Sequence, residues 1–384
     1  MSAPLTGIRV VDLTTFLSGP YATQILADLG ADVVKIEPPA GDSSRSIPPH
    51  FIDGDSAYFH SANRNKRSVV ADLKDEDGRR LLRSLLAVAD VLVENYRPEV
   101  LARLGFTPEQ TANPGLIWCS ISGFGQDGPY RDRPAYDMIV QALSGGMSLT
   151  GMPGGPAVRS GIPLGDLSAG MYAAIGILAA LHQRGDTGVG RRLDISMLDC
   201  QISMLSYQAA YHLLAGASPG RQGRAHDSIP TYRAFTAGDD VELVVTANTE
   251  RMWQGLCRVL KLTGLPDDPR FRDGGLRQAN RDELEPLLEA AFRTAPAEHW
   301  LKLLHEAGVP AAPINTVAAA LADPQVRHRR MVREIPRPGA DPMPVVGNPV
   351  RFSDGGADAE FRPPPRLGGD LVSVLADWLG QESE

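Results

Sequence analysis

Cysteine is scarce in this chain of 384 residues, and Cys119, Cys200 and Cys257 stand far apart. An odd number of widely spaced cysteines argues against a disulfide framework or a zinc cage, and it is typical of a protein in the reducing cytoplasm. The first residues, MSAPLTGIRVVDL, lack the basic segment and apolar run of a secretory signal. The apolar run 167–181 is too short, and too rich in Gly, Ala and Ser, to predict a membrane span.

Positive charge is not in excess either, because 46 acidic and 38 basic residues leave a net charge of −8. This balance argues against a general nucleic-acid surface. The turn DLTTFLSGPYA has one glycine where the dinucleotide-binding fingerprint needs three. There is no Walker sequence and no H-E-x-x-H pair, and SISGFG lacks the G-x-S-x-G spacing that would make Ser122 a nucleophile. The sequence therefore predicts no metal site and no nicotinamide cofactor.

Short β-branched runs alternate with helical patterns in the N-terminal half. The predicted strands are 7–13, 31–37, 68–73, 90–96 and 115–125, and the predicted helices are 19–30 and 75–89. This alternation predicts an α/β fold with a Rossmann-like, doubly wound parallel sheet and right-handed crossovers. Residues 184–199 are predicted to form a turn and then a strand or helix that returns to the same core.

The composition changes at 218–230, which is polar and rich in Gly and Pro. We predict a large α/β domain over 1–217, a linker over 218–230 and a smaller α+β domain over 231–327. Residues 328–384 are punctuated by prolines, and they predict a return strap with a C-terminal helix that completes the large domain.

One carboxylate, Asp166, precedes a run without charged residues that extends from Leu167 to Gln183. The run predicts a buried helix, and Asp166 is most simply its N-cap, which accepts backbone N–H groups of the first turn. The same place suits a carboxylate nucleophile, because a helix N-terminus stabilises a negative charge by about 0.3–1 kcal/mol, and by up to about 2 kcal/mol when partly buried. The residues alone leave both roles open.

Basic residues gather beside several predicted strands. The clusters are NRNKRS (63–68), NYRPEVLARLGF (95–106) and YRDRPAYD (130–137). Each charge taken singly is most simply a solvated loop residue. Together they lie at strand ends, where open α/β sheets bind ligands, and they indicate a polyanionic ligand.

Five motifs together resemble the family III CoA-transferases (CaiB/BaiF type), which include formyl-CoA transferase, carnitine CoA-transferases and α-methylacyl-CoA racemases. The motifs are VVDLTTFLSGPYATQILADLGADVVKIEPP, NRNKRSVVADLKDEDGRRLL, ADVLVENYRPEVLARLGF, SISGFGQDGPYRDRPAYDMIVQALSG and GDLSAGMYAAIGILAALHQRGDTGVG. The resemblance covers nearly the whole chain. It implies acyl-CoA and carboxylic acid substrates, no separate cofactor, and an interlocked homodimer of ring-shaped chains.

The resemblance implies that Asp166 attacks the thioester of acyl-CoA to form an aspartyl anhydride, which the CoA thiolate then converts to an aspartyl-CoA thioester. The residues implied to contact CoA or to line the acyl site are Phe16, Leu17, Ala71, Lys74, Asn95, Tyr96, Arg97, Arg103, Tyr136 and Asp137. Pro38 stands where formyl-CoA transferase has an Arg that contacts a CoA phosphate. The candidates to replace that Arg are Arg45, Arg64 and Lys66.

Two alternatives are an α-methylacyl-CoA racemase and a CoA-binding protein without turnover. Racemases carry a His before the Asp of the YD pair, whereas Tyr136 stands there in this chain and a phenol is a poor base at neutral pH. The intact Asp166 argues against a protein without turnover. The stretches GRAHDSIPTYRAF (223–235) and GVPAAPINTVAAALADPQV (308–326) favour dicarboxylate substrates of the succinyl-CoA type. From the first of them we expect Arg224 or His226 to meet the remote carboxylate.

Overall fold

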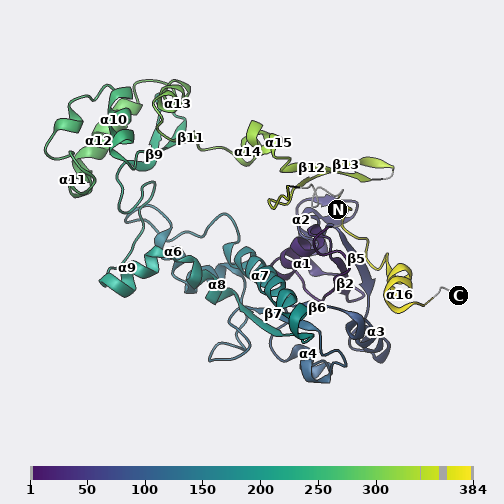
Figure 1. Cartoon of the computed structure of the whole chain (residues 1–384). Helices are drawn as coiled ribbons and strands as arrows, with labels where there is room; N and C mark the ends of the chain where they lie inside the picture. Colours follow the sequence, from purple (N-terminus) through teal and green to yellow (C-terminus); the bar gives the residue numbers. More distant parts are fainter. Residues whose placement is uncertain (1–2, 338, 354–360, 382–384) are drawn as a thin grey trace. The chain divides into compact units, whose positions relative to one another are not determined.

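The computed structural model describes residues 3–337, 339–353 and 361–381, so parts of the predicted segments 1–217 and 328–384 lie outside the described residues. The chain divides into two compact units (Figure 1). Unit 1 combines Met1–Met147, Arg159–Ser218 and Gln325–Glu384, and unit 2 combines Ser148–Val158 and Pro219–Pro324.

A six-stranded parallel sheet with the order β5-β2-β1-β6-β7-β8 forms the centre of unit 1. The strands are β1 (Arg9–Asp12), β2 (Asp32–Glu37), β5 (Lys66–Val70), β6 (Val91–Glu94), β7 (Ile117–Ser122) and β8 (Arg192–Ser196). After β1, the strands β2 and β5 are added on one side of it, and β6, β7 and β8 are then added on its other side. The predicted mixed α/β class with a central parallel sheet is confirmed, and each predicted strand overlaps an observed one.

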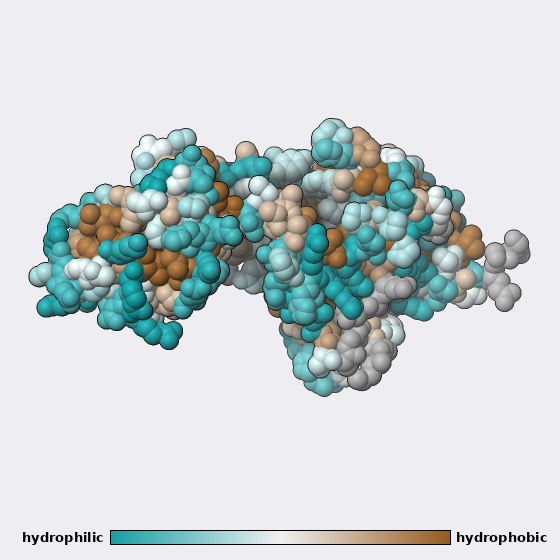
Figure 2. Space-filling view, turned by 90° about the horizontal axis from the view of Figure 1, so that it is seen from above, coloured by the Kyte–Doolittle hydropathy of each residue, from teal (hydrophilic) through white to brown (hydrophobic). Residues whose placement is uncertain are grey.

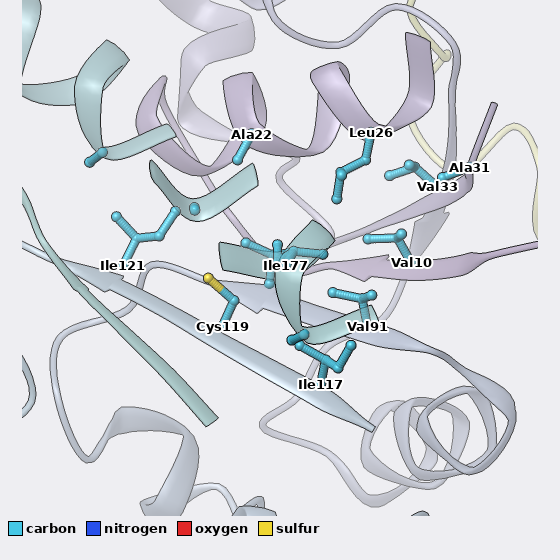
Figure 3. Close-up of a cluster of buried hydrophobic side chains, with 14 of the residues drawn as sticks. Val10, Ala22, Leu26, Ala31, Val33, Val91, Ile117, Cys119, Ile121 and Ile177 are labelled. Carbon is cyan, nitrogen blue, oxygen red and sulfur yellow. The ribbon is translucent and has the colours of Figure 1, made fainter. Parts of the chain in front are cut away.

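Helices cover both faces of this sheet. On one face α1 (Ser18–Asp28) packs against α7 (Leu164–Thr187), and their apolar side chains meet those of the strands. Figure 3 shows Ile177 of α7 among Val10 of β1, Val91 of β6 and Ile117 of β7. On the other face α3 (Glu76–Val88) and α16 (Leu371–Leu379) cover a second apolar core.

The chain that follows unit 2 returns to the sheet of unit 1. β12 (Val332–Arg337) and β13 (Ala340–Val346) form an antiparallel hairpin. Beyond it, the Gly368 N–H donates to Ser68 Oγ on β5 (2.9 Å), and the Ser68 N–H donates to Asp370 (2.8 Å). Trp378 of α16 donates its indole N–H to Asp32 at 2.7 Å. The last described helix thus completes a core that the first strands begin.

Unit 2 has a three-stranded antiparallel sheet of order β11-β10-β9, against which helices pack. Shorter helices and strands complete unit 1. These elements of unit 1 are η1 (Ser43–Ser46), β3 (Phe51–Ile52), β4 (Asp55–Ser56), α2 (Ala57–Ser61), α4 (Val100–Arg103), η2 (Pro108–Gln110), α5 (Asp137–Leu143), α8 (Met197–Met204) and α9 (Tyr207–Ala215). The boundary between the two units falls within α6 (Gly146–Leu149). Unit 2 holds β9 (Tyr232–Thr236), β10 (Glu242–Thr246), α10 (Glu250–Val259), η3 (Leu265–Asp267), α11 (Gly274–Ala279), α12 (Arg281–Phe292), α13 (Ala297–Glu306), β11 (Ala311–Pro313) and α14 (Val317–Ala322). α15 (Pro324–His328) begins where unit 2 ends.

α7 has 24 residues, which makes it longer than the apolar run that predicted it. Among the described residues it is the one helix whose length and composition would suffice to cross a membrane. However, Ala169, Ala173 and Ile177 are buried in the core of unit 1, and this packing accounts for the apolar composition of that side. Its other side leaves Met171 and Ile175 exposed.

On the face of the molecule drawn in Figure 2, hydrophobic residues lie in separate groups between hydrophilic ones.

Candidate active site

A pocket of about 200 Å³ lies in unit 1 at the carboxyl ends of β1, β6 and β7. The strand order reverses between β1 and β6, and open α/β sheets bind ligands at such a position. The predicted site residues that line this pocket are Phe16, Asn95, Tyr96, Arg97, Tyr136 and Asp166. The structure therefore brings together residues from four separate parts of the chain.

The other predicted site residues lie outside the pocket lining. Leu17 and Ala71 are buried. Lys74 and Arg103 are exposed, after β5 and at the end of α4. Asp137 begins α5 and contacts the first turn of α7. Their roles in binding CoA stay predictions.

Asp166 is the third residue of α7 and not its N-cap, so the capping prediction is wrong. Pro163 occupies the N-cap position and has no capping side chain. The Gly165 N–H instead donates to Asp137 Oδ1 at 2.7 Å, and Gln141 donates to the other oxygen of Asp137, also at 2.7 Å. Because Asp137 supplies the cap, the carboxylate of Asp166 is available to the pocket.

The carboxyl group of Asp166 is mostly withdrawn from water. Burial, together with the negative charge of Asp137, raises the pKa of Asp166 to about 7. Desolvation is the larger of these two causes, because burial removes the hydration that favours the charged form of a carboxyl group. A carboxyl group in a pocket whose pKa is shifted in this way is a candidate for chemistry.

Helix α1 also begins at the pocket. Its N-cap, Leu17, provides no side-chain hydrogen bond, and its first turn holds no acidic residue. Ser18, which is 4% exposed, lines the pocket. A Cβ on Gly170 would lie 2.7 Å from Ser18 O, so α1 and α7 touch one turn after Asp166. The uncapped N–H groups of α1 therefore favour a negative charge close to Asp166.

Tyr58 in α2 is a residue of the site that the sequence does not indicate. Burial and the charges of Asp166, Asp42 and Asp137 raise the pKa of Tyr58 to about 12, so its phenol stays protonated at neutral pH. The stretch around it, DSAYFHSANR, has no spacing that indicates chemistry. Only the fold brings Tyr58 close enough to Asp166 for the two groups to interact.

The three cations predicted to replace the phosphate-binding Arg are buried in ion pairs. Arg45 lies 2.7 Å from both Glu37 and Asp55. Arg64 lies 2.5 Å from Asp28, and Lys66 lies 3.0 Å from Asp12. That prediction is wrong, because the positive charges of all three are used to neutralise buried carboxylates.

The pocket itself contains three other arginines. Arg97 and Arg133 are exposed, and the guanidinium of Arg133 lies 3.7 Å from the centre of the Tyr130 ring. Arg131 lies 2.5 Å from Glu99. Arg97 and Arg133 are therefore the cations of this pocket best placed to meet an anionic ligand.

The residues predicted to hold a remote carboxylate lie in unit 2. Arg224 is 3.1 Å from Glu242, and the His226 ring stacks on Tyr232 with centroids 5.4 Å apart. Arg233 pairs with Glu285. These contacts are internal to unit 2, and the role in acceptor binding stays a prediction.

Comparison with known proteins places this architecture in a family. The model of CoA-transferase family III matches residues 5–371. The chain is 40% identical over 379 residues to the human succinyl-CoA:glutarate CoA-transferase, covering 98% of this chain and 86% of the human protein. It is 43% identical over 386 residues to the acetyl-CoA:oxalate CoA-transferase of Acetobacter aceti, covering 99% and 97%.

A solved structure supports the same assignment. A CAIB/BAIF family protein from Brucella suis is similar with a TM-score of 0.87 at 38% identity, covering 98% of this chain and all of that one. The similarity extends over the sheet, the α7 helix with Asp166 and the returning C-terminal segment alike. The chain therefore belongs to CoA-transferase family III.

Proposed function

We propose that this protein transfers CoA from an acyl-CoA donor to a free dicarboxylic acid, with Asp166 as the nucleophile. The observation that carries the proposal is the carboxyl group of Asp166, which is desolvated and placed beside the uncapped start of α1. The dicarboxylate preference is supported by relatives named for glutarate and oxalate, both of which are dicarboxylic acids.

In the proposed reaction, an oxygen of the Asp166 carboxylate attacks the thioester carbonyl, and CoA leaves as a thiolate. The thiolate then attacks the aspartyl carbonyl of the anhydride, which releases the donor acid and leaves an aspartyl-CoA thioester. The acceptor carboxylate attacks this thioester, and the returning thiolate cleaves the new anhydride at the acyl carbonyl. Each step exchanges one acyl bond for another, so Asp166 is regenerated without an added cofactor.

The surroundings of Asp166 suit these steps. Each attack places negative charge on a carbonyl oxygen, and the N–H groups of Ser18 and Gly19, which receive no side-chain cap from Leu17, can stabilise such charge. No histidine is among the residues that line this pocket, so the pair of bases that a racemase would need is not assembled there.

We also propose that a second copy of the chain covers the apolar surface of unit 1, as the expected interlocked homodimer requires. In support, Leu213 and Leu214 of α9 are 78% and 87% exposed, and Met171 and Ile175 of α7 are exposed as well. Exposed apolar patches of this kind mark association surfaces. Sedimentation equilibrium tests the proposal, and a monomer at micromolar concentration would contradict it.

The transferase proposal is tested by incubating the protein with a panel of acyl-CoA donors and free acids and identifying new acyl-CoA by mass spectrometry. We expect transfer with succinyl-CoA and dicarboxylate acceptors, and less with monocarboxylates of the same length. Absence of any new acyl-CoA across the panel would contradict the proposal.

The pH dependence of the reaction should report the raised pKa of Asp166. Since only the ionised carboxylate attacks, kcat/KM for acyl-CoA should rise with pH and level off above about pH 7. Asp137→Asn removes a negative charge but keeps an oxygen for the Gly165 N–H, so the midpoint should move to lower pH by roughly one unit.

Asp186→Asn serves as the control, because it also removes one negative charge but does so near the C-terminal end of α7, far from Asp166. Equal pH profiles for the wild type and Asp137→Asn would show that Asp137 does not influence the nucleophile.

The two exposed arginines of the pocket should bind the phosphates of CoA. We expect Arg97→Ala and Arg133→Ala each to raise the KM for acyl-CoA by about tenfold, which corresponds to about 1.4 kcal/mol, with little change in the KM for the acceptor acid. Arg80→Ala, an exposed arginine on α3, is the matched control. A rise confined to the acceptor KM would instead assign these arginines to the remote carboxylate.

A further inference from the structure

The turn between β1 and α1 is held by side chains from other parts of unit 1. Its residues Thr14, Thr15 and Phe16 lead into the pocket, and Thr15 and Phe16 line it. Side chains bind five backbone groups of the turn. The Thr14 N–H donates to Asp12 (2.8 Å), and the Thr14 carbonyl accepts from Lys35 (2.6 Å). The Thr15 N–H and carbonyl both bond to Asn95 (2.9 Å each), and the Phe16 N–H donates to Asp42 (3.4 Å). In most turns such groups bond to backbone or water, so this turn depends on specific side chains.

Asn95 makes the two central bonds. It follows β6 directly, and its carboxamide lies against the peptide of Thr15, accepting from the N–H through Oδ1 and donating to the carbonyl through Nδ2. The pair resembles one rung of a β-ladder with a side chain in place of the second strand. Both polar atoms of Asn95 are thus directed at the turn.

A buried charge supports the turn from the sheet side. Lys35 is fully buried and lies 2.8 Å from Asp42, while it donates to the Thr14 carbonyl. Asp42 in turn accepts the N–H groups of Ser44 and Phe16. The Lys35–Asp42 pair and Asn95 therefore hold the turn from two directions.

The conformation that they hold is unfavourable by itself. Phe16 has φ +62°, in the left-handed region that phenylalanine seldom adopts. A residue in this region is strained, and the conformation persists only where the surroundings impose it. With Phe16 so placed, its ring meets that of Tyr136 edge to face, with centroids 6.1 Å apart, and α1 begins at the pocket.

We infer that Asn95 is a positioning residue, which holds the Thr15 peptide so that the Phe16 turn and the first N–H groups of α1 face Asp166. The inference deepens the proposed function and rests on it. It differs from the role expected from the sequence, in which Asn95 contacts CoA. Asn95 lines the pocket, but its Oδ1 and its Nδ2 each already bond to the backbone of Thr15, so the orientation of its carboxamide is set by the turn.

The test compares Asn95→Ala with Asn113→Ala. Asn113 is a matched control because its carboxamide also binds backbone, donating to the Leu86 and Ala89 carbonyls and accepting from the Gly115 N–H, away from the pocket. We expect Asn95→Ala to lower kcat about 100-fold, the size of effect that a small misplacement of reacting groups can cause. The dissociation constant for CoA should change by less than about threefold. Amide hydrogen exchange should accelerate in the peptide that spans residues 13–17, and Asn113→Ala should leave kcat and that peptide unchanged.

Two outcomes would overturn the inference. If Asn95→Ala weakens CoA binding about tenfold or more with kcat intact, Asn95 is a ligand contact. If exchange in residues 13–17 and kcat both stay at wild-type values, the turn does not need Asn95. Asn95→Ser, a smaller perturbation, serves if the alanine variant does not fold. The exchange measurement needs no substrate, so it tests the turn even if the wild type proves not to be a transferase.

Discussion

Asp166→Asn should abolish CoA transfer and at the same time stabilise the protein. An amide cannot form the anhydride, so we expect kcat to fall by at least about 1,000-fold, as is usual when a nucleophile is removed. CoA binding should persist, because the other pocket residues are unchanged. Treating the wild type with acyl-CoA and then hydroxylamine should modify Asp166 alone, which peptide mapping can establish. Label on another carboxylate, or substantial activity in the variant, would contradict the assignment.

The gain in stability follows from the raised pKa. Folding moves the pKa of Asp166 from 3.8 to about 7, so the folded state holds its proton more tightly than the unfolded state. The contribution of this group to stability is therefore present in full below about pH 4 and is lost as the pH rises through 7. Asn carries no charge, so Asp166→Asn should raise the free energy of unfolding by about 1–4 kcal/mol at pH 8, at about 1.4 kcal/mol per pKa unit.

Denaturant titrations at pH 5 and pH 8 check the sign of this effect. The difference between the variant and the wild type should be larger at pH 8 than at pH 5. An equal difference at both values would mean that Asp166 keeps its ordinary pKa in the folded protein.

Gly170→Val should damage both stability and catalysis. The added Cβ would lie 2.7 Å from Ser18 O and 3.0 Å from a ring carbon of Tyr21, and a backbone oxygen cannot move aside without moving α1. Overpacking of this kind costs about 1–3 kcal/mol. Because α1 begins at the pocket, its displacement should also lower kcat by about 100-fold or more.

Gly185→Val provides the matched control within the same helix. No atom lies within 4 Å of a Cβ at Gly185, so the same substitution there meets open space. Thermal unfolding and kcat of this control should stay close to the wild type. If Gly170→Val behaves like Gly185→Val, the close contact between α1 and α7 is not what places the pocket.

The sheet could be predicted from the sequence because its signals are local. Runs such as ADVVKIE and DVLVENY carry their β-branched residues within one strand, and Asp75, predicted to open a helix, does cap α3. Segment 148–158 belongs to unit 2, although no local pattern separates it from its neighbours.

The functional details depend on pairs that are distant in the chain. Asp137 and Gly165 are 28 residues apart, and no spacing rule connects them, so the sequence predicts Asp166 rather than Asp137 as the cap of α7. The basic stretch NRNKRS looked like a ligand site, yet Arg64 and Lys66 meet Asp28 and Asp12 from earlier elements. The sequence shows which residues are basic, but it does not show which carboxylate each of them pairs with in the folded core.

The discontinuity of unit 1 has a consequence for how the protein is made. Val374 and Trp378 of α16 complete the core of the first strands, yet the ribosome synthesises them after all of unit 2. At a synthesis rate of about 5–20 residues per second, roughly 8–30 s pass between the synthesis of residue 218 and that of the first residue of α16. Unit 2 lies almost wholly within one continuous stretch and can fold during that interval. The emerging sheet of unit 1 is thus a natural client for chaperones, which would shield the face that α16 finally covers.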